Sequence, residues 1–167
     1  MSHPSLGLPP PDRGAGHPAA ADRLRNARAR LAQIALETSL QLDPTFSDRY
    51  DQLALRRFLR DYDTHIEQLA RALETGEERF VVQYGEWLVP VFRHRHVPMK
   101  DFMLLLDGLR AAALTVLNSH DAALLRDLME RWQARLKHHQ RLAGDHKGNS
   151  IVRFFWKGAG IADDSVV

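Results

Sequence analysis

Residues 48–76 read DRYDQLALRRFLRDYDTHIEQLARALETG and decide the fold class of this 167-residue chain. Their apolar side chains recur at intervals of three and four residues, the spacing of one face of an α-helix: Leu55, Phe58, Leu59, Tyr62, Ile66, Leu69, Ala70 and Leu73. Ser47 or Asp48 can cap the start of this helix, and Gly76 can end it because glycine adopts the left-handed conformation at little steric cost. The segment is therefore predicted to be one long amphipathic helix.

Helical spacing also extends to both sides of this segment. It predicts further helices over about 22–42, 77–96, 101–117 and 121–143, and no stretch alternates as a strand would. Pro44 and Pro98 mark helix ends, since proline disfavours helical geometry in the residue before it. Pro90 lies inside the third helix, so the segment from Gly85 to Pro90 is a candidate bend. The prediction is an all-α single bundle of about five helices, globin-like or four-helix-bundle-like.

The composition excludes several classes of protein. The chain has no cysteine, so a disulfide scaffold, a thiolate metal site and a cysteine nucleophile are excluded. No apolar run reaches the length of a membrane-spanning helix. The net charge is only +2, and nucleic-acid binding is not expected. The small net charge conceals an uneven distribution. Residues 126–157 carry eight basic and three acidic side chains, and a net negative charge in the rest of the chain offsets most of this excess.

The ends of the chain differ in composition from its middle. Residues 1–20 hold five of the eight prolines and are expected to be a disordered tail. Residues 21–146 form the expected helical domain, and residues 147–167 a basic, aromatic C-terminal tail. The first residues lack the apolar core of a signal peptide, so a cytoplasmic location is the default expectation.

One motif resembles a known family. It runs Leu73-x-x-Gly76-x-x-x-Phe80-x-x-x-Tyr84-x-x-Trp87-Leu88, followed by Val97-Pro98 and by Leu105, Leu106 and Leu109. It is similar to the globin-like, often haem-free sensor domains of stressosome proteins, and to the helical domain that precedes the cobalamin-binding domain in some bacterial regulators. The resemblance covers about residues 50–118. It implies a free-standing sensor-type or adaptor-type domain that commonly self-associates.

The same resemblance suggests an alternative in which the domain binds a tetrapyrrole, haem or cobalamin. The candidate binding residues are His65, Tyr84, Trp87, His94 and His96, of which His65 lies at the edge of the apolar stripe. No cofactor is predicted, since a histidine with satisfied hydrogen bonds at a helix interface is the preferred interpretation of His65. Asp61 and His65 form one i,i+4 pair that could hold part of a zinc site, but no metal site is predicted.

The C-terminal tail contains a compact group of aromatic and basic side chains. Exposed aromatic residues are unfavourable in water, so these are expected to dock on the bundle, on a protein partner or weakly on a membrane surface: Arg153, Phe154, Phe155, Trp156 and Lys157. No motif places an acid, a base and a nucleophile together. The expected function is a non-enzymatic regulatory, sensory or protein-interaction module, with an enzyme of unrecognised type as a third possibility.

Overall fold

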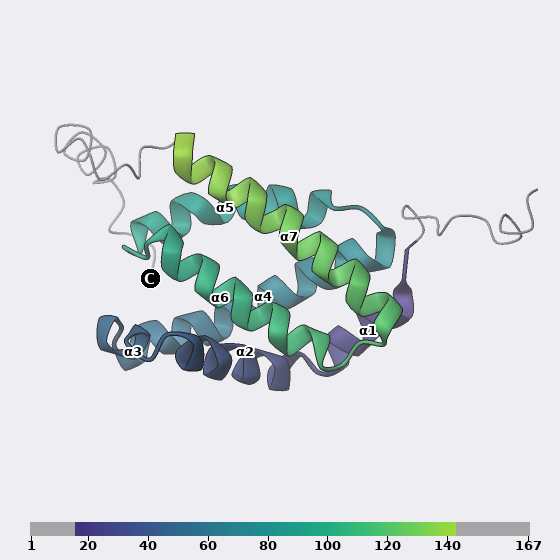
Figure 1. The fold of residues 1–167 in the computed structure, drawn as a ribbon, viewed down its shortest axis with the longest axis horizontal. Coiled ribbons are helices and arrows are strands. Elements are labelled where there is room, and N and C mark those ends of the chain that lie inside the picture. The colour runs from purple at the N-terminus through teal and green to yellow at the C-terminus, as the bar shows by residue number, and fades with distance from the viewer. Residues whose placement is uncertain (1–15, 143–167) are drawn as a thin grey trace, which may run out of the picture.

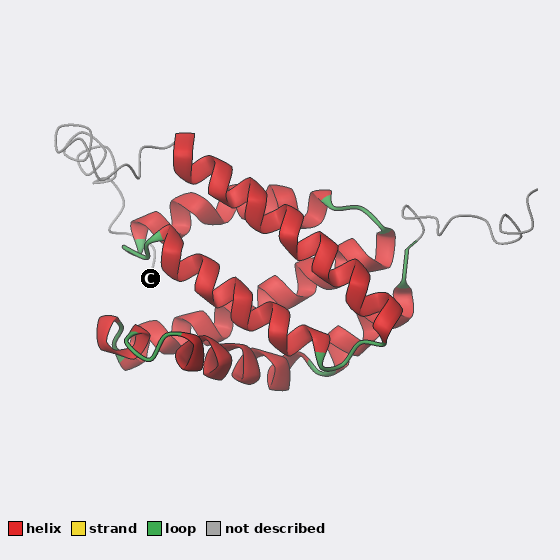
Figure 2. Ribbon diagram, in the orientation of Figure 1, coloured by secondary structure: helices red, strands yellow, loops and turns green. Residues whose placement is uncertain are grey.

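The computed structural model describes residues 16–142, and the regular secondary structure in this part of the chain is all α-helix, as predicted (Figures 1 and 2). Figure 2 shows helices joined by short loops, with no strand among these residues. The elements are α1 (Pro18–Asn26), α2 (Arg28–Leu42), α3 (Phe46–Arg49), α4 (Gln52–Thr75), α5 (Arg79–His94), α6 (Met99–Leu114) and α7 (Ser119–Leu142).

The described residues form seven helices where the sequence predicted about five. The first predicted helix is divided at Ala27, whose backbone leaves helical geometry at φ −98° and ψ 2°. The break lets the chain turn, so that α1 packs on α4 while α2 packs mainly on α6. The short helix α3 is the other addition, and the fully buried ring of Phe46 anchors it.

Helix α1 begins earlier than expected, inside the segment predicted to be a tail. Pro18 is its first residue, a position where proline is favoured because its missing N–H would have no helical partner. Ala20 and Ala21 are fully buried, so this helix belongs to the core. Residues 1–15 and 143–167 lie outside the described residues, and with them most of the predicted N-terminal tail and all of the predicted C-terminal tail.

Five longer helices pack as a closed ring around the core. In order of contact the ring runs α2, α6, α7, α5, α4 and back to α2 (Figure 1). The largest side chains that are fully buried inside it include Tyr62, Phe102 and Trp132, from α4, α6 and α7. Each helix presents one apolar face to this core, as the three-and-four spacing predicted.

The most extensive helix pair, α2 with α6, meets at Gly108. A β-carbon at Gly108 would lie 2.3 Å from the carbonyl oxygen of Ala35 and 2.1 Å from the hydroxyl oxygen of Ser39. Ser39 Oγ donates to that same carbonyl at 2.9 Å. Gly108 is therefore the point at which the two backbones come close enough to exclude any side chain.

Within the described residues, no helix has both the length and the apolar character that a bilayer span requires.

Candidate functional site

His65 lies in the centre of the ring of helices, on α4. Its side chain is 1% exposed, and the Tyr84 hydroxyl on α5 lies 2.7 Å from its Nδ1 atom. Five aromatic rings surround the imidazole with centroids within 6.4 Å: Tyr62, Tyr84, Phe92, Phe102 and Trp132. The sequence placed His65 at the edge of an apolar stripe, and the structure places it at the centre of an aromatic cage.

The cage keeps His65 neutral. Burial, together with the nearby positive charge of Arg95, lowers the pKa of His65 to about 3. Burial also raises the pKa of the Tyr84 hydroxyl above its ordinary value. Both groups are therefore uncharged at neutral pH, and they are hydrogen-bonded to each other. This pair is not poised to exchange protons with a substrate near pH 7.

Trp132 and Gly85 complete the cage, and the sequence did not single out Trp132 as a site residue. The Trp132 indole is fully buried, and its Nε1 has no hydrogen-bond partner among the described residues. A β-carbon at Gly85 would lie 2.4 Å from that nitrogen. Gly85, predicted as part of a bend, is thus the point where α5 approaches the indole, and α5 continues as helix through Pro90.

Asp61 pairs with Arg95 rather than with His65. Arg95 Nη1 donates to Asp61 Oδ2 at 2.6 Å and ties the end of α5 to α4. Burial nevertheless raises the pKa of Asp61 above its usual value. The i,i+4 spacing of Asp61 and His65 therefore does not reflect a shared metal ligand set. The pairing with Arg95 has no sequence signal, because 34 residues separate the two partners.

Trp87 lies on the outer face of α5, with 60% of its surface exposed. Its ring stacks on Tyr84, with centroids 5.9 Å apart and planes 22° apart. Tyr84 in turn bonds to His65. Three of the five predicted binding residues, Trp87, Tyr84 and His65, thus form one continuous path from the surface to the core.

His94 and His96 lie at the exposed end of α5. His96 has a positive φ of 57°, and the Val97 N–H donates to the Phe92 carbonyl at 2.9 Å. These are the features of a helix C-cap, a position that glycine usually occupies. The backbone at His96 therefore serves to end the helix.

Replacing His96 with glycine is expected to raise the free energy of unfolding by about 1 kcal/mol, because a side chain disfavours the left-handed conformation. Urea denaturation of the two proteins measures the difference. His94→Gly is the matched control: His94 is the last residue of the same helix and has no positive φ, so glycine there is expected to destabilise. A destabilising His96→Gly change would contradict the cap assignment.

The geometry does not favour the tetrapyrrole alternative. The Nδ1 atom of His65 is held by Tyr84, and aromatic side chains enclose the ring. A tetrapyrrole at His65 would have to displace at least one of these rings. The five predicted binding residues line neither the cavity between α4 and α7 nor the hollow beside α1 and α2.

The predicted partner-binding residues Arg153, Phe154, Phe155, Trp156 and Lys157 lie outside the described residues. Helix α7, which leads toward them, carries exposed basic side chains at Arg126, Arg135 and Lys137.

Comparisons with protein-family models, curated proteins and solved structures find no match to this chain. The resemblance to globin-like sensor domains therefore rests on the sequence motif alone.

Proposed function

We propose that this chain is a non-enzymatic regulatory module that self-associates through the outer face of α5. Trp87 carries the proposal. Among the described residues it is the most exposed of the large apolar side chains, ahead of Leu42 and Leu53. A solvent-exposed tryptophan in the middle of a helix indicates a protein-binding surface, because burying its ring against a partner is strongly favourable.

Trp87 belongs to a longer stripe on α5. Phe80, Tyr84, Trp87 and Val91 follow one another at intervals of four, three and four residues, and all four are exposed or partly exposed. This spacing is typical of the seam between two helices in a coiled coil. We call these four residues the α5 stripe. It supports the contact of α5 with another helix.

The occupant that fits the α5 stripe best is the α5 stripe of a second copy. Trp87 is near the middle of the sixteen-residue helix α5, so a two-fold axis close to it would bring Trp87 against the partner's Trp87. With that axis at right angles to α5, the two helices would run antiparallel, which sets their dipoles in favourable opposition.

The charges at the two ends of α5 support the same arrangement. Glu77 and Glu78 precede the helix, are exposed and pair with Arg79 and Arg131 within the chain, whereas Arg93 and His94 lie in its last turn. In an antiparallel pair the acidic end of one copy lies beside the basic end of the other. Complementary charges of this kind fix the orientation of a pair more than its affinity.

The regulatory part of the proposal rests on the path from Trp87 to His65. Tyr84 contacts both residues, so a change at the dimer surface shifts a ring that forms part of the aromatic cage. Because the cage is densely packed, such a shift has to be accommodated by neighbouring helices. A signal at the dimer surface would then be transmitted to the core through changes in helix packing. His65 itself is enclosed, which supports a role other than catalysis.

Trp87→Ser is expected to raise the dissociation constant of the dimer about 100-fold, since a central tryptophan acts as a hot spot in both copies. Sedimentation equilibrium of the full chain measures this constant. Leu42→Ser is the matched control, because Leu42 is exposed to 56% but lies on α2. A wild-type chain that stays monomeric at all concentrations would disprove the proposal, as would unchanged dimerisation of Trp87→Ser.

The basic, aromatic segment Arg153–Lys157 is proposed as a separate docking point for a protein partner. Deleting residues 149–167 is therefore expected to leave the dissociation constant of the dimer unchanged. Sedimentation equilibrium of the shortened chain tests this separation. If the deletion abolishes the dimer, self-association depends on the C-terminal segment and the α5 stripe is not sufficient.

A further inference from the structure

Three side chains that are far apart in the sequence meet where the first described residues pack on α7. They are His17, which precedes α1, and His120 and Asp121, which lie in the first turn of α7. One ligand atom of each lies within 4.8 Å of the other two. The rings of His17 and His120 have centroids 5.4 Å apart. Imidazole and carboxylate are the groups that bind zinc in proteins that lack thiolate ligands.

The backbone fixes the position of His17. Its N–H donates to the carbonyl of Leu73 near the end of α4 at 2.7 Å. At Gly16 the backbone lies so close to α4 that a β-carbon would be 1.7 Å from the carbonyl oxygen of Glu74. The glycine before His17 thus allows this segment to dock on α4. The His17 side chain is held toward the start of α7 as a consequence.

The start of α7 fixes Asp121 in a similar way. The Asn118 side chain accepts from the Asp121 N–H at 2.8 Å, which caps the helix. The Asp121 side chain is only 9% exposed, but its ion-pair partners His17 and Arg23 lie at 3.8 and 3.9 Å. These distances are longer than a hydrogen bond. Among the described residues this nearly buried carboxylate has only these distant partners, which favours a cation that approaches more closely.

We propose that His17, His120 and Asp121 bind a divalent metal ion of the zinc type. Zinc bonds of about 2.0–2.2 Å require ligand atoms roughly 3.5 Å apart, so the three side chains need to close by only about 1 Å. Arg23, whose side chain is 47% exposed, can turn outward as the cation enters. This site is independent of the α5 stripe.

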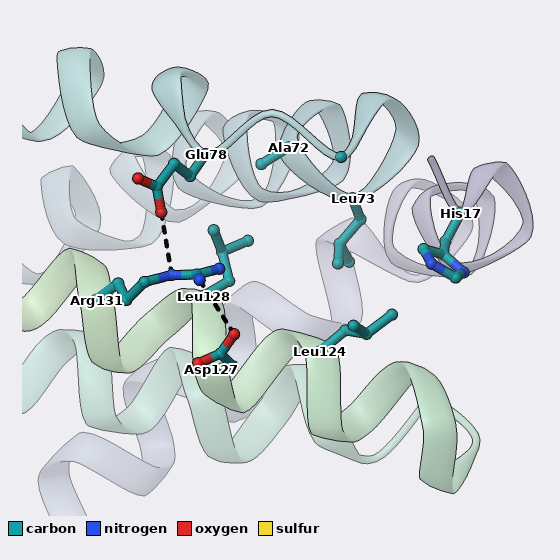
Figure 3. Close-up of a pocket in the computed structure, with 9 residues that line it drawn as sticks. His17, Ala72, Leu73, Glu78, Leu124, Asp127, Leu128 and Arg131 are labelled. Atoms are coloured by element: carbon teal, nitrogen blue, oxygen red, sulfur yellow. Dashed lines mark ion pairs between the residues drawn. The ribbon is translucent and has the colours of Figure 1, made fainter. Parts of the chain in front are cut away.

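The three residues leave a fourth coordination position for water or a small ligand, as in open zinc sites. His17 also lines a cavity of about 250 Å³ between α4 and α7 (Figure 3). Figure 3 shows His17 at one end of this cavity, with Leu73 and Leu124 beside it. Water can therefore reach His17 through this cavity.

Titration of the full chain with Zn²⁺ against a chromophoric chelator tests the site. One zinc ion is expected to bind per chain, and His120→Gln and Asp121→Asn are each expected to weaken binding at least tenfold. His120 is exposed, so its substitution is not expected to disturb folding. The melting temperature should rise with zinc in the wild type and not in His120→Gln, because the metal ties the segment before α1 to α7.

Adventitious binding by other histidines is the main alternative, and a double variant controls for it. His138 and His139 are neighbours on α7 and lie outside the proposed site. The combined change His138→Gln and His139→Gln is expected to leave the zinc affinity unchanged. The proposal is overturned if the wild type binds no zinc, if His120→Gln binds as tightly as the wild type, or if the control variant loses the binding.

Discussion

Gly108→Ala is expected to lower the free energy of unfolding by about 3 kcal/mol, at the upper end of the range for over-packed sites. In an open helix the same substitution stabilises by about 1 kcal/mol, because alanine is the better helix former. At Gly108 the added methyl group would meet the backbone oxygen of Ala35, which moves only if α2 and α6 separate. Urea denaturation, followed by circular dichroism, measures the change.

Gly85→Ala provides the matched comparison on another helix. Its added methyl group would meet the side chain of Trp132, with no backbone atom among the three nearest contacts. A side chain can shift by rotation more easily than a helix can move, so the loss of stability is expected to be smaller than at Gly108. If the two variants rank in the opposite order, the close approach of α2 and α6 at Gly108 is not rigid.

The stability of the protein is expected to fall by about 2.5 kcal/mol between pH 7 and pH 4.5 through His65 alone. In the unfolded chain this histidine takes up a proton near its ordinary pKa of about 6.5. In the folded chain its pKa is about 3, because the aromatic cage excludes water. The unfolded state therefore binds the extra proton across this window. The contribution of His65 to the free energy of unfolding is fully present above pH 6.5 and is lost as the pH falls toward 3.

His65→Phe tests this effect because it keeps a planar ring in the cage and removes the titrating group. The loss of unfolding free energy between pH 7 and pH 4.5 is expected to be about 2.5 kcal/mol smaller in the variant. Asp61, whose pKa is raised, changes stability in the opposite direction, but it is present in both proteins and cancels. Equal pH dependence in wild type and His65→Phe would contradict the buried, neutral state of His65.

Apolar periodicity was sufficient to predict the long helices and most of the buried residues. The stripe from Leu55 to Leu73 matches α4, with Phe58, Tyr62, Ile66 and Leu69 all buried. Periodicity reports which face of a helix is apolar, and that information survives in a single sequence. The division at Ala27 could not be predicted in this way, because alanine is a strong helix former and the chain turns there to suit tertiary packing.

The candidate site likewise has features that the sequence predicted and features that it did not. Tyr84 and His65 were both predicted as site residues, but their direct contact depends on how α4 and α5 cross, which no local pattern encodes. The cluster at His17 was missed entirely, because His17 lies in a segment that its prolines and glycines marked as a tail. Two short signals were present: the glycine before His17, and the adjacent His120 and Asp121 at a helix start.

The closed ring of helices has a consequence for the order of events during protein synthesis. Chains emerge from the ribosome N-terminus first, at about 5–20 residues per second. The ring closes only through α7, the last of its helices to be made, which contacts both α5 and α6. Until α7 arrives, the aromatic cage lacks Trp132 and the apolar faces of α5 and α6 stay open to water. The nascent chain thus passes through a stage at which a chaperone that recognises exposed apolar helices could bind it.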